Sequence, residues 1–327
     1  MSQLYWPTSI TNLLEEDVHL PRLAGCLLLT GIMRFVAGAL LSGLISLWPL
    51  QAVAETELSQ TPQLIIFGHP HEVVDPFTLY PIKLLQAALD KSPEPYLLQA
   101  SPVPMVQDRS LRQIASGQQV DVFWSMTSIE RERYLLPVRI PIDKGLFGWR
   151  LLLTTEQNMA LTTNVFTVAQ LKKRIFLQGH DWPDTQILRS NQLKVLTSDH
   201  YRSMFDMIAT GRAELFPRSI LEVWDEIELE KHSLKVDPTI SIYYPTALYF
   251  FVSKHQPALA KRIEDGLNQL IESGEFEQLF LAAYGAEIQE AINSKRRVIY
   301  LNNPLLPKET PLERKELWVD VATLMGQ

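Results

Sequence analysis

The sequence of 327 residues lacks the short motifs that most often mark a catalytic domain. It has no Gly-x-Ser-x-Gly nucleophile motif, no phosphate-binding P-loop and no glycine fingerprint of a dinucleotide-binding domain. Its formal net charge is −7, and its lysine and arginine residues are scattered along the chain, which argues against nucleic-acid binding. These absences favour a protein without a cofactor and without chemistry of its own.

Cysteine is nearly absent as well. Cys26 is the only one, and it lies upstream of a predicted signal-peptide cleavage site, so the mature chain forms no disulfide. Cysteine-free exported domains are ordinary among larger bacterial periplasmic proteins and unusual among eukaryotic secreted ones. We therefore predict a periplasmic location.

The signal peptide is predicted from the longest apolar run of the sequence. Met33-Arg34 provides a basic start, residues 36–50 carry no charge, and Ala52-Val53-Ala54 supplies the small residues that signal peptidase requires. We expect translation to start at Met33 and cleavage to follow Ala54, so that residues 1–54 are an N-terminal extension plus signal peptide. The alternative is a transmembrane anchor, because the apolar residues between 23 and 50 exceed the roughly 20 needed to span a bilayer.

Apolar segments alternate with helical patterns along the rest of the chain, which is longer than one small core requires. This alternation is typical of α/β folds with parallel sheets, and it occurs twice, which predicts two lobes. The predicted strands are 64–67, 96–98, 120–124, 149–155, 174–177, 194–196, 213–216, 240–244 and 247–252. The predicted helices are 77–90, 108–116, 182–188, 200–210, 220–230 and a long helical region at 257–284.

Three segments together suggest a family. They are Gln118–Trp124 followed by Thr127–Arg131, Met207–Phe216 with its Gly211-Arg212 pair, and Pro257–Gly285. In order and spacing they resemble the periplasmic solute-binding proteins of ABC transporters, of the polar amino-acid type.

The resemblance implies an α/β fold of two lobes joined by two crossover strands that form a hinge, near residues 147–155 and 245–252. Residues 55–150 and 248–327 would form the first lobe, and residues 151–247 the second. The resemblance does not extend beyond residue 286. We expect the tail, residues 297–327, which contains several prolines, to lie on the surface of the first lobe.

The departures from the family pattern bear on the ligand. Gly179-His180-Asp181-Trp182 stands where the family usually has Gly-Thr-Thr, and Phe216-Pro217-Arg218-Ser219 puts an arginine where a carboxylate for the ligand's ammonium is expected. Ordinary α-amino acids are therefore doubtful ligands. A small polar or anionic solute fits the sequence better.

Two arginines are candidate solute contacts. Arg131 matches the family arginine that binds a ligand carboxylate, and a guanidinium suits this role because its planar fork bonds both oxygens. The alternative is a solvated helix face, since charges alternate around it. Arg218 follows a predicted strand end, where open α/β sheets bind ligands. Its alternative is an ion pair with Glu214 or Glu222.

Six further residues are weaker candidates for the solute site. Aromatic rings often form pocket walls, although core packing is the commoner role of a single tryptophan. Hydroxyl groups bind polar ligands, but they also cap helices, and so do aspartates. A helix N-terminus favours anions. On these grounds the candidates are Trp124, Ser125, Thr127, His180, Asp181 and Trp182.

A metal site is not predicted. His69 and His71 with Glu72 share a spacing that places two histidines on one strand face, but no third or fourth ligand is evident nearby.

The sequence thus predicts a monomeric binding protein that captures a small solute between two lobes for an ABC permease or a sensor. Two alternatives stay open. One is a periplasmic lyase or dehydratase of the same fold, acting on a small carboxylic acid with His180, Asp181 or Glu214 as the acid. The other is a degenerate domain that binds a protein partner, which a filled cleft would favour.

Overall fold

The computed structural model describes residues 61–69, 79–230 and 233–320. The predicted signal peptide and start site lie outside these residues, as do His71 and Glu72. Within the described residues no helix combines the length and the apolar character needed to cross a bilayer.

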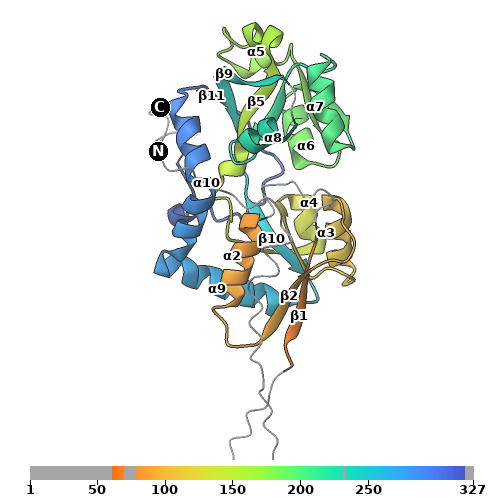
Figure 1. The fold of residues 1–327 in the computed structure, drawn as a ribbon, viewed down its shortest axis with the longest axis vertical. Coiled ribbons are helices and arrows are strands. Elements are labelled where there is room, and N and C mark those ends of the chain that lie inside the picture. Colours follow the sequence, from red (N-terminus) through yellow and green to blue (C-terminus); the bar gives the residue numbers. More distant parts are fainter. Residues whose placement is uncertain (1–60, 70–78, 231–232, 321–327) are drawn as a thin grey trace, which may run out of the picture. The chain divides into compact units, whose positions relative to one another are not determined.

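The first lobe, in which Figure 1 labels β1, β2 and β10, is built on a five-stranded mixed sheet with the order β2-β1-β3-β10-β4. The first three strands are parallel, and β10 runs antiparallel to both β3 and β4. Its strands are β1 (Gln63–Phe67), β2 (Tyr96–Ala100), β3 (Val122–Met126), β4 (Leu135–Val138) and β10 (Leu248–Ser253). Its helices are α2 (Leu79–Leu89), α3 (Gln107–Ala115), α4 (Ile129–Tyr134) and α9 (Pro257–Ser273), followed by α10 (Glu275–Asn293).

Helical spacing of apolar residues explains how α9 packs. Its buried side chains recur every three to four residues, so one face of the helix packs against α2. Gly266 lies on that face, where a Cβ atom would stand 2.0 Å from the carbonyl oxygen of Ala88. The close contact of the two helices therefore requires a glycine at this position.

The second lobe contains a four-stranded sheet with the order β11-β9-β5-β8 and a parallel pair of strands, β6 and β7. The two sheets adjoin, because the Leu177 N–H donates to the Leu215 carbonyl oxygen at 2.9 Å. The strands are β5 (Trp149–Thr155), β6 (Ile175–Gly179), β7 (Lys194–Ser198), β8 (Phe216–Ser219), β9 (Leu234–Tyr243) and β11 (Arg297–Tyr300). The helices are α5 (Val168–Leu171), α6 (Pro183–Ser190), α7 (Tyr201–Ala209) and α8 (Val223–Glu230).

Two segments that connect the lobes lie against each other. Residues 139–148 lead from β4 to β5, and residues 244–247 lead from β9 to β10. The Tyr244 N–H donates to the Gly148 carbonyl oxygen at 3.2 Å, and a Cβ atom at Gly148 would stand 2.0 Å from the Tyr244 carbonyl oxygen. The two crossover backbones are thus in direct contact.

The tail corrects one domain prediction. The strand β11 pairs in parallel with β9, so it belongs to the second lobe and not to the surface of the first. The apolar side chains of Val298 and Ile299 explain this, because pairing at the sheet edge buries both. The chain then returns to the first lobe, where the Leu305 carbonyl oxygen accepts from the Ile129 N–H at 2.9 Å.

Candidate functional site

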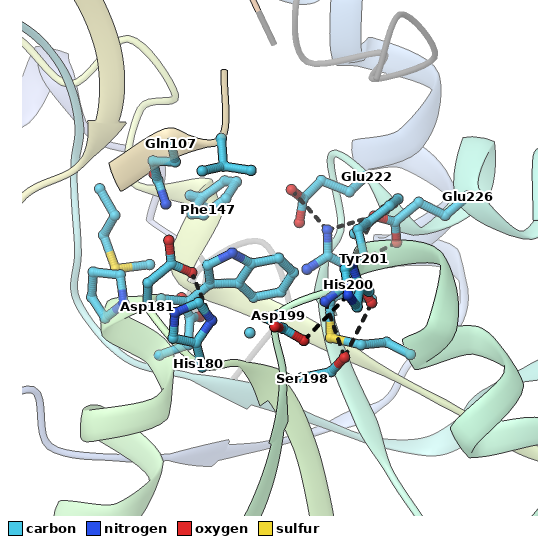
Figure 2. A pocket seen from close by; sticks show the side chains of 18 of the residues that line it. Gln107, Phe147, His180, Asp181, Ser198, Asp199, His200, Tyr201, Glu222 and Glu226 are labelled. Carbon is cyan, nitrogen blue, oxygen red and sulfur yellow. Dashed lines mark hydrogen bonds and ion pairs between the residues drawn. The ribbon is translucent and has the colours of Figure 1, made fainter. Parts of the chain in front are cut away.

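A cavity of about 660 Å³ is lined by residues from both lobes. The first lobe contributes the end of β3 and the segment before α3. The second contributes the loops that follow the parallel strands β6 and β7, together with β8 and α8. Loops at the carboxyl ends of parallel strands are the usual ligand-binding position in open α/β sheets. Figure 2 shows several of the polar side chains that face this cavity.

The loop after β6 places Trp182 on the cavity wall. Gly179 allows this, because a Cβ atom there would stand 2.5 Å from the Trp182 ring. The ring stacks on Phe216 at a centroid distance of 6.4 Å and an interplanar angle of 16°. Pro183 then starts α6, and Trp182 itself is the N-cap residue, so Asp181 does not cap this helix. His180, Asp181 and Trp182 all line the cavity, and their contact with a solute stays a prediction.

Arg218 also lines the cavity, but its charge is paired within the chain. It is buried, and its Nε donates to both carboxylate oxygens of Glu226 at 2.9 and 2.8 Å. A second guanidinium nitrogen lies 3.1 Å from Glu222 Oε1. Burial by itself would lower the pKa of Arg218, but Glu222 and Glu226 outweigh it and hold the pKa well above its ordinary value. The ion-pair alternative therefore describes Arg218, with Glu222 and not Glu214 as a partner.

A second buried arginine was not predicted. Arg150 lies on β5, with one terminal nitrogen 2.6 Å from Asp184 and the other 3.3 Å from Glu222. Its Nε donates to the Tyr244 hydroxyl at 3.0 Å, and that hydroxyl donates to Asp184. Burial lowers its pKa, but Asp184, Tyr244 and Glu222 together raise it above the ordinary value. The sequence did contain a signal for this pairing. Arg150 is the only charged residue in the apolar strand Trp149–Thr155, and a buried charge requires a partner of opposite charge.

Glu222 joins the two arginines into one network of charges. Two guanidinium groups meet three carboxylates, those of Asp184, Glu222 and Glu226. Hydroxyl and backbone donors supply the remaining bonds to these carboxylates: Tyr201 donates to Glu226 at 2.5 Å, and the Ser219 N–H donates to Glu222 at 3.1 Å. Both arginines of this network are thus in ion pairs within the chain, which does not favour either as the contact for an anion.

The first lobe contributes an aromatic wall. Trp124 lines the cavity and stacks on Phe123 at a centroid distance of 5.0 Å and an angle of 19°. Ser125 and Thr127 do not line the cavity. The Ser125 hydroxyl donates to Gln107, which does line it, and the Thr127 hydroxyl donates to Glu132 at 2.6 Å. Neither residue caps α4, whose N-cap residue is Ser128.

Arg131 lies behind this wall and does not line the cavity itself. It occupies the first turn of α4, where its side chain is 6% exposed, so the prediction of a solvated helix face is wrong. Its guanidinium donates to the Ser125 hydroxyl and to the Met126 carbonyl oxygen, both at 2.7 Å. Burial lowers the pKa of Arg131, since its hydrogen-bond partners among the described residues are neutral.

Two further points of the sequence analysis concern a catalytic acid and a metal site. Glu214 is not on the cavity: it accepts from the Ile175 N–H at 2.7 Å and lies 3.6 Å from Arg174. Among the described residues, no group of three or more histidine, cysteine, aspartate or glutamate side chains is arranged to hold a metal ion. The carboxylates of Asp184, Glu222 and Glu226 are held in ion pairs, which does not favour a role as a free acid.

Comparisons with known proteins identify the fold through similar solved structures. No family model matches the sequence, and no curated protein is significantly similar to it. Among solved structures, a periplasmic binding protein of Salmonella typhimurium with high arginine specificity is similar, with 17% identity and a TM-score of 0.51, covering 66% of this chain and 97% of that protein.

Two further structures give the same picture. A structure from the glutathione import system of Streptococcus mutans is similar with 14% identity and a TM-score of 0.55, covering 69% of this chain and 96% of the other. An ancestral amino-acid-binding protein, a precursor of cyclohexadienyl dehydratase, is similar with 16% identity and a TM-score of 0.51, covering 68% and 95%. The chain therefore has the two-lobed α/β fold of amino-acid-binding periplasmic proteins, which confirms the predicted fold class.

Proposed function

We propose that this chain is an exported binding protein that encloses a small polar or anionic solute between its two lobes. The observation that carries the proposal is the cavity of about 660 Å³, which is lined by both lobes at the carboxyl ends of parallel strands. Its volume falls within the range of roughly 300–1,000 Å³ typical of small-molecule sites. A filled cleft would have favoured the alternative of a protein-binding domain.

Arg131 is the proposed anchor for an anionic group of the solute. The hydrogen bonds of this buried guanidinium within the described residues go to neutral groups, and the nearby carboxylates, such as Asp181, do not fully offset its desolvation. It lies directly behind Met126 and Ser125, and Met126 lines the cavity. A solute carboxylate that reaches this point gains a charge-assisted hydrogen bond, while the aromatic rings of Trp124 and Trp182 pack against its body.

Export, a monomeric state and delivery of the solute to a permease or a sensor are parts of the same proposal. Proteins of this fold include ones described as periplasmic and one from an import system, which supports an exported carrier. In this proposal, the predicted signal peptide is cleaved off after Ala54 during export.

A solute screen tests the function. Purified protein is melted in the presence of small organic acids, amino acids and neutral polar solutes, and hits are titrated by calorimetry. At a solute concentration of 100 times Kd, binding adds about 2.7 kcal/mol to the unfolding free energy, a rise of several degrees in Tm. The proposal fails if no hit binds with a stoichiometry near one to one.

The variant Arg131→Met tests the anchor. It keeps the apolar stem and removes the charge, so we expect at least a tenfold loss of affinity for an anionic hit and little change for a neutral one. Arg133→Met, on the same helix, is the matched control. Equal affinity of Arg131→Met and the parent protein would exclude Arg131 from the site.

A further inference from the structure

The side chain of Arg218 is surrounded in the way that a bound cation is surrounded in a recognition site. The centre of its guanidinium lies 4.8 Å from the ring centroid of Trp182, 5.1 Å from Phe216 and 5.7 Å from Tyr201. The carboxylates of Glu226 and Glu222 pair with the same guanidinium. Aromatic faces combined with carboxylates are the features that recognise guanidinium and ammonium groups.

The groups around this cation come from separate parts of the second lobe. Trp182 precedes α6, Tyr201 starts α7 and Glu226 lies on α8, whereas Arg218 itself lies on β8. The Tyr201 hydroxyl donates to Glu226 at 2.5 Å and so fixes the carboxylate independently of Arg218. A site of this kind would keep most of its walls if the arginine side chain were removed.

We propose that Arg218 is a built-in occupant of a cation site on the cavity wall and that it thereby determines which solutes bind. While the guanidinium of Arg218 fills the site, a solute cannot place a guanidinium or ammonium group there. The native protein therefore selects solutes without a cationic group at this end of the cavity. This inference rests on the proposed function, because it concerns the specificity of the same cavity.

Removal of the occupant tests the inference. In Arg218→Ala, Glu226 and three aromatic rings lose their cation, while Glu222 keeps its pair with Arg150. We expect methylguanidinium chloride at millimolar concentration to raise the Tm of the variant saturably by several degrees. The parent protein in the same titration should show no saturable rise. Sodium chloride of equal ionic strength and methylurea, a neutral analogue of similar shape, should have no such effect on the variant.

Two matched variants identify the site. Arg174→Ala removes an arginine from an ion pair with Glu214, which is not on the cavity, and should not respond to methylguanidinium. The double variant Arg218→Ala, Glu226→Gln lacks one carboxylate of the site and should lose at least tenfold in apparent affinity for methylguanidinium. An equal response of Arg218→Ala and the parent protein, or a response that Glu226→Gln leaves unchanged, would overturn the proposal.

Folding of the variant is itself a readout. If Arg218→Ala is unfolded after purification, its yield of folded protein is measured on refolding with and without methylguanidinium. A higher yield with the cation supports the proposal, and an equal yield contradicts it. The outcome does not depend on the native solute: a failed solute screen beside a positive methylguanidinium result rejects the proposed function alone, and the reverse result rejects only the role of Arg218.

Discussion

Asp143 is a buried carboxylate at the junction of the two crossover segments. Its oxygens accept from the Phe147 N–H at 2.9 Å and from the Leu248 N–H at 3.0 Å, so one side chain bonds both connections between the lobes. Burial is the largest influence on this group and outweighs the backbone donors, which raises the pKa of Asp143 from 3.8 to about 6. The folded state therefore binds a proton at Asp143 more tightly than the unfolded state does.

This difference predicts a pH dependence of stability. As the pH rises from about 4 to about 6, the unfolded state loses the proton first, so the contribution of Asp143 to the free energy of unfolding falls by on the order of 3 kcal/mol. Asp143→Asn cannot ionise, so its unfolding free energy should rise relative to that of the parent protein over this interval and then stay level. Urea denaturation at several pH values between 3.5 and 7.5 measures this difference.

An exposed aspartate provides the control for that experiment. Asp265→Asn, in a surface pair with Lys261, should change the unfolding free energy by less than about 1 kcal/mol at every pH. A difference between Asp143→Asn and the parent protein that is constant from pH 4 to pH 7 would contradict the assignment.

The predicted site residues that line the cavity lie within or directly after strands. Trp124 and Arg218 belong to β3 and β8, and His180, Asp181 and Trp182 follow β6, where the carboxyl ends of strands meet. The charged residues of the ion-pair network were harder to predict. Glu226 lies on a helix and Arg150 within a strand, and the local sequence of neither residue indicates which charged side chain it pairs with. The pairing of Arg218 depends on the packing of α7 and α8 against β8, which no local pattern specifies.

At the scale of elements, the contact between α9 and α2 depends on one glycine. Gly266→Ala would place a methyl group against the backbone of Ala88, and backbone atoms cannot move aside as a flexible side chain does. We expect a loss of 1–3 kcal/mol or more in the free energy of unfolding, measured by urea denaturation.

Gly285 is a matched control within α10. Apart from its chain neighbours and the backbone of its own helix, no heavy atom of the described residues lies within 4 Å of the position that its Cβ would take. Gly285→Ala should therefore stabilise the protein by up to about 1 kcal/mol through helix propensity. If Gly266→Ala stabilises the protein as Gly285→Ala does, helix propensity and not helix packing governs position 266.

The elements that were predicted correctly are those with a strong local signal. Strands β1, β3 and β6 and helices α3, α6 and α7 lie within a few residues of their predicted positions, because apolar periodicity and a glycine or proline mark each of them. No bounds were predicted for the short helix α4 or for strand β4, since the five charged and aromatic residues after Ile129 and the proline within β4 give no clear period. β9 begins six residues earlier than predicted, because its first half pairs with β5 although it contains Lys235 and Pro238.

At the scale of the whole molecule, the tail links parts of both lobes. After β11 joins the second sheet, the Asn303 amide donates to the Pro245 carbonyl oxygen in the second crossover at 2.8 Å. Farther on, the Val319 N–H donates to the Lys144 carbonyl oxygen in the first crossover at 3.0 Å, and Leu317 is fully buried. These contacts join the tail to both crossover segments, so we expect the tail to restrain an opening of the lobes.

Deletion of residues 303–327 therefore should change both stability and domain motion. Loss of the buried Leu317 side chain alone removes about 2–3 kcal/mol of stabilisation, and loss of the bonds at Pro245 and Lys144 frees the two crossovers. We expect a lower Tm for the deletion variant. In small-angle X-ray scattering without solute, we expect its radius of gyration to exceed the value calculated from the structure without the deleted residues. Leu317→Ala separates the two effects, because it creates a cavity that lowers Tm but leaves the backbone bonds of the tail in place. If the deletion variant has the scattering profile of Leu317→Ala, the tail stabilises the fold without restraining the hinge.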